Sequence, residues 1–306
     1  MSLLAKLKRF VLDSHYRSCI LLDKGFFNYM DDKSFVEKQY RTFFGKNPDL
    51  EHPQTFNEKL QWLKLYDHRP EYVTMVDKYL VKDYVANIIG EKYIIPTIGV
   101  WDNPKDIDFD ALPEQFVLKC NHDSGTVHIC TDKSSLNIKK VQNCLRKGLR
   151  RNYYLHGREW PYRNVNRKII AEPYLKDESG YELKDYKIFC FDGVPKMIQV
   201  DFDRFIGHKR NLYDLDWNLI QAEIKFQNGW DTIIERPAVL EELLELASRL
   251  SKGYPHIRTD FYVCGEQIYF GELTLCHGSG TEEFRPAEFG KMVGDWMNLD
   301  MVRNRS

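Results

Sequence analysis

The chain lacks the segments that would carry it into or across a membrane. No apolar run approaches the roughly 18 residues of a membrane-spanning helix, and the N-terminus shows no secretory signal. It also lacks paired cysteines, because its seven cysteines are odd in number and form no C-x-x-C motif. This pattern argues against a disulfide framework or a zinc site and predicts free thiols in a reducing cytoplasm.

Glycine, proline and net charge are also low. With 18 Gly and 12 Pro among 306 residues, and with 43% hydrophobic and 14% aromatic residues, the composition excludes a disordered or fibrous chain and predicts a globular protein of about two domains. The net charge of −1 conceals two opposed segments. Residues 133–168 carry eleven Lys or Arg and one acid, whereas residues 231–300 carry thirteen acids and six Lys or Arg. The first segment suits anions and the second suits cations.

Helices and hairpin-like strands alternate along the chain, which predicts an α+β fold. Thr55 is a plausible N-cap for the helix that begins at Phe56. We expect mainly helix over 1–76, further helices over 77–89, 138–151 and 237–250, and strands over 93–101, 116–120, 126–131, 168–175, 185–191, 195–203, 208–217, 257–265 and 267–275.

The clearest chemical signal is Arg258-Thr-Asp260 followed, after a tight turn, by Glu272-Leu-Thr274. Because side chains alternate along a strand, each motif places two polar groups on one face, and pairing of the strands brings them together. Two carboxylates and a guanidinium suit Mg²⁺ and nucleotide phosphates. The alternative is an ordinary cross-strand ion pair on a solvated face.

Lys119 lies among apolar residues of FVLKC, immediately before the loop NHDSG. A lysine in such a setting meets an anion or extends its stem along the surface, and both alternatives remain open here. The following Gly-Ser loop presents backbone N–H groups of the kind that bind phosphate, although the segment matches neither the Walker pattern nor G-x-G-x-x-G.

The order of these motifs resembles the ATP-grasp superfamily from about residue 77 to the C-terminus. The resemblance rests on DK-x-x-x-K from Asp77, IIPTIGVWD, LPEQFVLKCNHDSGTVHI, IIAEPYL, RTD and GELT. TFNEKLQWLKLYD, DYKIFCFDG and YFGELT are further similar to the teichuronopeptide-synthesis (TupA-like) branch, found with bacterial surface-polysaccharide genes. The resemblance implies two α+β lobes whose antiparallel sheets grip ATP, preceded by a helical N-terminal segment. The implied division is 1–76, 77–170 with the basic lid lobe, and 171–306 with the metal site.

The resemblance also implies roles for particular residues. Lys78 and Lys119 would reach the phosphates, Lys119 and Arg258 would act in catalysis, and Asp260 and Glu272 would carry Mg²⁺. Thr274 stands where many members have Asn, which leaves a second metal site open. The remaining ATP contacts would come from His122, Ser124, Gly125, Glu172, Tyr174, Leu175, Asp185 and Lys187, and those to substrate from Ser279, Gly280 and Thr281.

The implied reaction is ligation of a carboxylate to an amine through an acyl phosphate, with ATP and Mg²⁺. The expected substrates are an amine or amino acid and an acidic glycan or sugar precursor, so that an amino acid joins a uronic acid of a capsule, O-antigen or teichuronic polysaccharide. The alternative function is a glycosyltransferase with a D-x-D metal site, for which Asp201-Phe-Asp203 is one of four matches. Aromatic residues interleave with the basic stretch, but we expect no nucleic-acid partner.

The first twelve residues, MSLLAKLKRFVL, form an amphipathic pattern with Lys6, Lys8 and Arg9 on the polar side. Such a helix either packs on its own domain or lies on an anionic membrane surface. Together with the free thiols, this pattern leads us to expect a cytoplasmic protein, with peripheral contact at the inner face of the plasma membrane as an open possibility.

Overall fold

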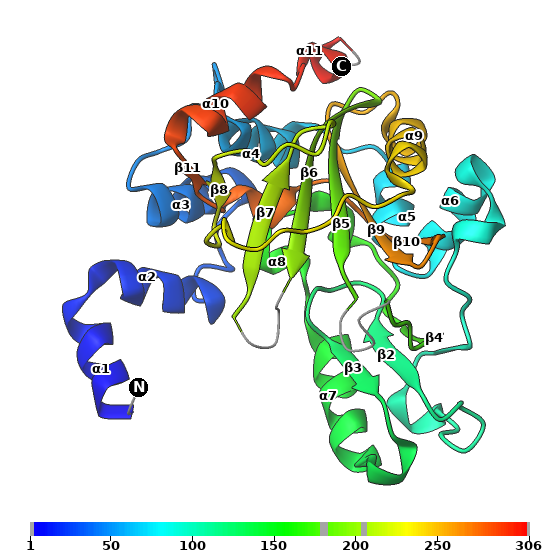
Figure 1. The fold of residues 1–306 in the computed structure, drawn as a ribbon. Helices are drawn as coiled ribbons and strands as arrows, with labels where there is room; N and C mark the ends of the chain where they lie inside the picture. The colour runs from blue at the N-terminus through cyan, green and yellow to red at the C-terminus, as the bar shows by residue number, and fades with distance from the viewer. Residues whose placement is uncertain (1–2, 178–182, 203–206, 305–306) are drawn as a thin grey trace.

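The computed structural model describes residues 3–177, 183–202 and 207–304 (Figure 1). Its centre is a five-stranded antiparallel sheet in the order β10-β9-β5-β6-β7, and a four-stranded antiparallel sheet in the order β1-β4-β2-β3 lies beside it. The strands are β1 (Gly99–Trp101), β2 (Phe116–Cys120), β3 (Val127–Cys130), β4 (Ile169–Pro173), β5 (Asp185–Phe191), β6 (Val194–Phe202), β7 (Lys209–Tyr213), β8 (Glu223–Ile224), β9 (Ile257–Cys264), β10 (Gln267–Thr274) and β11 (Phe284–Arg285).

The helices account for most of the N-terminal quarter and cover the sheets. Thr55 caps α4 through a capping box with Glu58, as the sequence predicts. The helices are α1 (Leu3–Leu12), α2 (Ser14–Asp23), α3 (Asp32–Phe44), α4 (Phe56–Tyr66), α5 (Glu71–Val76), α6 (Leu80–Ile89), α7 (Ile138–Arg150), α8 (Tyr154–Gly157), α9 (Leu240–Ser251), α10 (Ala287–Asp295) and α11 (Asp300–Arg303).

The central strand β5 is buried along its whole length because helices cover both faces of the five-stranded sheet. Ile188 and Cys190 belong to the apolar cluster that includes residues of α6 and α9. Phe189 and Phe191 alternate with them and belong to the opposite cluster, with residues of α4 and α10. The burial of both faces explains why DYKIFCF is almost continuously apolar after its first three residues.

The four-stranded sheet is covered on one face only. Phe116, Leu118 and Cys120 of β2 pack with Val141 and Leu145 of α7 in a third apolar cluster. The alternate residues of β2 are less buried and point away from α7. Because helix α7 occupies one face, the other face of this sheet is left to meet the central sheet across a cleft.

Several expected boundaries are wrong. Within 93–101 only Gly99–Trp101 forms a strand, because Pro96 has no N–H to contribute to a ladder. The helix expected from residue 77 begins at Leu80, since the Asp77 carboxylate accepts hydrogen bonds from the backbone N–H groups of Tyr79 and Leu80. The helix expected from residue 237 begins at Leu240.

Two other expectations concern the thiols and the membrane. All seven cysteines are free, as predicted. Over the three described ranges, no helix combines the length and hydropathy needed to pass through a bilayer. Of the two alternatives for the first helix, packing of its apolar face on its own domain is not supported, because Leu4, Leu7 and Val11 are 81%, 64% and 64% exposed.

Candidate functional site

A cleft of about 550 Å³ lies between the two sheets and is lined by most of the side chains that the sequence singles out. The four-stranded sheet contributes the residues of β2, β3 and β4 that point away from α7, and the central sheet contributes polar residues of β5, β9 and β10. The predicted site residues that line it are Lys78, Lys119, Ser124, Gly125, Glu172, Tyr174, Leu175, Asp185, Lys187, Arg258, Asp260 and Glu272.

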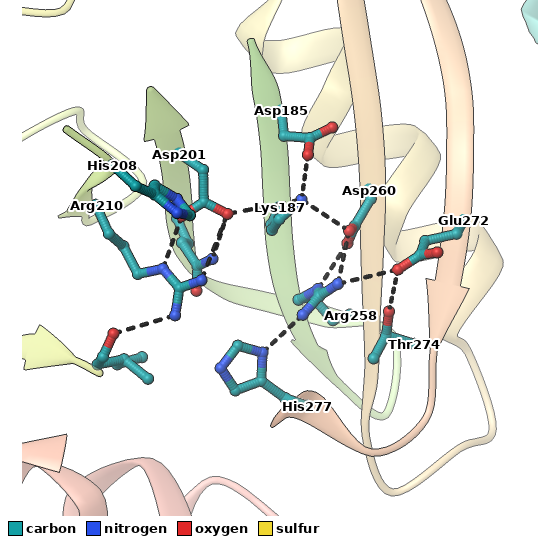
Figure 2. Close-up of polar contacts among 12 residues, drawn as sticks. Asp185, Lys187, Asp201, His208, Arg210, Arg258, Asp260, Glu272, Thr274 and His277 are labelled. Carbon is teal, nitrogen blue, oxygen red and sulfur yellow. Dashed lines mark hydrogen bonds and ion pairs between the residues drawn. The ribbon is translucent and has the colours of Figure 1, made fainter. Parts of the chain in front are cut away.

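Arg258, Asp260 and Glu272 meet as the strand alternation predicts. Glu272 pairs with Asp260 in the β9–β10 ladder, directly after an irregularity at Gly271. Arg258 binds Asp260 with both ends of its guanidinium: Nε lies 2.7 Å from Oδ1 and Nη2 lies 2.7 Å from Oδ2. The same Nη2 lies 3.3 Å from Oε1 of Glu272 (Figure 2).

The electrostatics of these carboxylates differ. Burial is the largest influence on Asp260 and raises its pKa above the usual range, despite the opposing charges of Arg258 and Lys187. Burial also acts to raise the pKa of Glu272, but the charges of Lys78, Arg258 and Lys187 outweigh it and lower that pKa to about 2. Glu272 is therefore an anion across the physiological pH range.

Lys187 holds the centre of the polar face (Figure 2). Its Nζ lies 2.6 Å from Oδ2 of Asp185 and 3.1 Å from Oδ2 of Asp260. The attraction of these carboxylates outweighs desolvation and raises the pKa of Lys187. The ammonium is therefore fixed and charged between strands β5 and β9, where it faces the cleft.

Glu172 lines the cleft, and its carboxylate forms ion pairs that the sequence does not reveal. Its side chain is 6% exposed, and its carboxylate bridges two lysines, with Oε2 lying 2.6 Å from Nζ of Lys119 and Oε1 lying 2.7 Å from Nζ of Lys82. Burial acts to raise the pKa of Glu172, but the charges of Lys119 and Lys82 outweigh it and hold the pKa below its usual value. The carboxylate thus orients Lys119 toward the cleft.

The loop between β2 and β3 borders the same cleft. Nζ of Lys78 donates to the carbonyl of Asp123 at 2.8 Å and lies 3.9 Å from Oε2 of Glu272, so it connects the loop to the central sheet. Ser124 and Gly125 line the cleft, whereas His122 is buried outside it, with Nε2 donating to the carbonyl of Arg151 at 3.1 Å. The position of His122 therefore does not support a direct ATP contact.

The cleft also has an apolar wall that the sequence analysis missed. Val127 and Ile129 of β3 are 47% and 45% exposed, although both are large hydrophobic side chains, and they lie on the cleft side of the strand. Val117, Tyr174 and Leu175 line the same cleft. The sequence signal for this wall is the alternation in TVHICT, in which Val127 and Ile129 point away from α7.

A second cavity of about 670 Å³ adjoins the cleft, and the two share Lys78, Ser124, Arg258 and Glu272 as lining residues. Three predicted residues, Thr274, Ser279 and Thr281, line this second cavity. Its outer wall comes from the N-terminal helices and from the segment around α8, through His15, Cys19, Leu22, Asp23, Gln39, Phe43, Tyr153, His156, Glu159 and Tyr162.

The turn at residues 278–280 is held from behind by α4. Nζ of Lys64 donates to the carbonyl of Ser279 at 2.7 Å, and Nε2 of Gln61 donates to the carbonyl of Gly280 at 2.8 Å. Lys64 was missed in the sequence, although it follows Leu60 by one helical turn and therefore shares the apolar face of α4. Burial lowers its pKa.

A chain of polar contacts through His277, Glu282, Arg210 and Asp201 supports Arg258 from the opposite side. His277 accepts a hydrogen bond from Nη1 of Arg258 at Nδ1, over 2.7 Å. Its Nε2 lies 3.1 Å from Oε2 of Glu282, which also accepts from Arg210 at 2.8 Å. Arg210 in turn pairs with Asp201 at 2.7 Å.

The carboxylate pair fits a magnesium ion that is shared with phosphates. In the part of the chain that the structure describes, no three His, Cys, Asp or Glu side chains gather as a metal-binding group. Asp260 and Glu272 offer hard oxygen donors at one edge of the cleft, and Thr274 donates to Oε1 of Glu272 at 3.1 Å. Mg²⁺ is commonly held by one or two carboxylates together with substrate phosphates, which matches this donor set.

Two antiparallel sheets that enclose lysines, an arginine and a carboxylate pair define the ATP-grasp class of ATP-dependent ligases. The chain belongs to the TupA-like ATP-grasp family, whose model matches residues 58–298. This match confirms the family, the fold class and the ligase expectation drawn from the sequence.

Solved structures with a similar fold include ATP-grasp enzymes of low sequence identity. The D-alanine–D-alanine ligase from Bacillus anthracis is 18% identical, with 76% of this chain and 67% of that chain covered and a TM-score of 0.41. The enzyme of the same name from Helicobacter pylori is 14% identical, with 79% and 69% covered and a TM-score of 0.41. The ATP-grasp ligase PsnB is 11% identical, with 80% and 66% covered and a TM-score of 0.41. A search of curated protein sequences gives no significant match.

Proposed function

We propose that this protein joins a carboxylate to an amine through an acyl phosphate, with ATP bound in the cleft between the two sheets. The observation that carries the proposal is the meeting of two cavities at Lys78, Ser124, Arg258 and Glu272. A γ-phosphoryl group at this junction would face the second cavity, where a carboxylate substrate could approach it. Family membership supports ATP as the phosphoryl donor.

The cleft offers a complementary surface for each part of ATP. The apolar wall of Val117, Val127 and Ile129 suits adenine, and the cations of Lys78 and Lys119 suit the phosphates. Asp260 and Glu272 would hold Mg²⁺, which supplies charge neutralisation for phosphoryl transfer.

The reaction needs positioning and charge compensation rather than a nucleophilic side chain. A carboxylate oxygen of the substrate forms a bond to the γ-phosphorus as the bond to the β–γ bridging oxygen breaks, which yields the acyl phosphate and ADP. The amine nitrogen then bonds to the carbonyl carbon and loses a proton, and inorganic phosphate leaves. The fixed guanidinium of Arg258 would stabilise the charge on the transferred group and on the tetrahedral intermediate.

The substrate part of the proposal is an amino acid and a uronic acid of a bacterial surface polysaccharide, handled on the cytoplasmic side of the membrane. This part rests on the similarity to the TupA-like branch, whose members are found with bacterial surface-polysaccharide genes. The second cavity is consistent with it: Lys225 and Arg285 offer cations to a uronate, Asp23 offers an anion to an ammonium group, and Tyr153 and Tyr162 offer aromatic faces to a sugar ring.

The test is a screen of uronic-acid nucleotides and lipid-linked oligosaccharides against amino acids, with ADP release as the readout. Glu272→Ala should abolish substrate-stimulated ADP release while the variant still folds and unfolds cooperatively in urea, whereas Glu245→Ala on the exposed side of α9 should leave ADP release and the urea midpoint unchanged. Normal turnover by the Glu272 variant would overturn the proposed metal role.

The glycosyltransferase alternative predicts a different nucleotide. Consumption of a UDP- or GDP-sugar without ADP release would favour it over ligation. Two of the four D-x-D pairs do not support it, because Asp201 is paired with Arg210 and Asp214 accepts hydrogen bonds from the backbone of Asp216 and Asn218. Asp203 lies outside the described residues.

A further inference from the structure

Helix α1 presents an apolar stripe that no described part of the chain covers. Leu4, Leu7 and Val11 follow one another at helical spacing and are all more than 60% exposed. In Figure 1, α1 projects from the body of the molecule beyond α2. An exposed stripe of this kind on a projecting helix needs a surface to cover it.

The polar side of α1 is the side that contacts α2. Arg9 lies about 200° around the helix from Leu7, and it forms an ion pair with Asp13 at 3.2 Å. Its guanidinium also stacks over the ring of Tyr16, 4.4 Å from the centroid. Arg17 of α2 donates to the carbonyl of Val11 at 2.9 Å and so fixes the end of α1. The apolar stripe is therefore directed away from α2.

The charges beside the stripe identify its partner. Lys6 and Lys8 are exposed and lie about 100° from Leu7 in opposite directions around the helix, so one basic side chain stands on each side of the stripe. Residues 1–12 contain three basic side chains and no acid. Long basic side chains at both borders of an apolar face can extend to lipid headgroups while the apolar face enters the acyl boundary.

We propose that α1 docks the protein on an anionic phospholipid surface, lying in the plane of the membrane with Leu4, Leu7 and Val11 inserted. Because α2 follows directly and lines the second cavity through His15, Cys19 and Leu22, docking holds that cavity next to the bilayer. The inference gives the membrane contact a specific surface and is independent of the ligation chemistry.

The experiment is cosedimentation of the full chain with vesicles, without nucleotide or substrate, so that a failed ligation assay does not affect it. The wild type should bind phosphatidylglycerol–phosphatidylethanolamine vesicles, bind phosphatidylcholine vesicles weakly, and dissociate as salt rises. Leu7→Glu/Val11→Glu should weaken vesicle binding more than about tenfold, and Lys6→Gln/Lys8→Gln should weaken it by about fivefold per lysine.

The matched control is Ile233→Glu, which changes a 92% exposed apolar residue outside α1 and should bind vesicles as the wild type does. Unchanged urea midpoints would show that all variants fold. Equal binding by the α1 variants and the wild type would overturn the proposal. Concentration-dependent dimerisation that Leu7→Glu/Val11→Glu abolishes, without wild-type vesicle binding, would also overturn it in favour of a second copy of the chain.

Discussion

Replacing Glu172 with glutamine should destabilise the protein because it strands two lysine cations in the interior. The Glu172 carboxylate is 2.6 Å from Lys119 and 2.7 Å from Lys82, and the three side chains are 6%, 17% and 11% exposed. Removing one partner of a buried ion pair costs about 3 kcal/mol, since the remaining charges lose their compensation. For a chain of this size, that loss corresponds to a fall in Tm of roughly 6 °C.

Urea unfolding followed by tryptophan fluorescence would measure the change in the free energy of unfolding. Glu245→Gln, at an exposed acid of α9, serves as the matched control and should shift that free energy by less than about 0.5 kcal/mol. Lys119→Met/Glu172→Gln should be more stable than Glu172→Gln, because one stranded cation is gone. If Glu172→Gln matched the control variant, the bridging carboxylate would contribute nothing and the reasoning would be refuted.

Three further perturbations have defined outcomes. Burial lowers the pKa of His256 from 6.5 to about 3, so the stability that its neutral form provides is complete above pH 6.5 and is lost as the pH falls toward 3. Between these pH values, His256→Gln should reduce the slope of the free energy of unfolding against pH, measured by urea unfolding, by about 1.4 kcal/mol per pH unit. An unchanged slope would contradict the assignment. Gly294→Ala should lower the free energy of unfolding by about 2 kcal/mol, because the added Cβ would lie 2.8 Å from the backbone nitrogen of Phe56 and closer still to the carbonyl oxygen of Gln54. An unchanged urea midpoint would contradict this expectation and show that α10 can move. Arg258→Lys should lower the rate of ADP release about a hundredfold with little change in ATP affinity, and an equal loss in both would argue for a binding role.

The sequence was informative where local alternation determines geometry. The pairing of Arg258, Asp260 and Glu272 follows from side-chain alternation on two strands and one tight turn, and the structure reproduces it. Thr55 was likewise predictable as an N-cap, because its partner Glu58 is only three residues away.

The sequence was less informative where a residue's role depends on distant segments. Glu172 matched a strand motif, but the ion-pair bridge that its carboxylate forms was not predictable from that motif, because its two lysine partners come from other elements. The sequence also left the partner of α1 open, since an amphipathic pattern shows that a helix has an apolar face and does not show what covers that face. The roles of individual site residues in ATP and substrate binding stay predictions.

The N-terminal helices and the matched family region line different parts of the two cavities. The matched family region begins at residue 58, whereas His15, Cys19 and Phe43 belong to the preceding helices and line the second cavity. The side chains that we propose to bind the phosphates and the metal are thus carried by one part of the chain, and much of the outer cavity wall by another. Mutations in α2 and α3 could therefore change which molecule is accepted while the phosphoryl-transfer machinery stays intact, which makes these helices the natural place to engineer a new specificity.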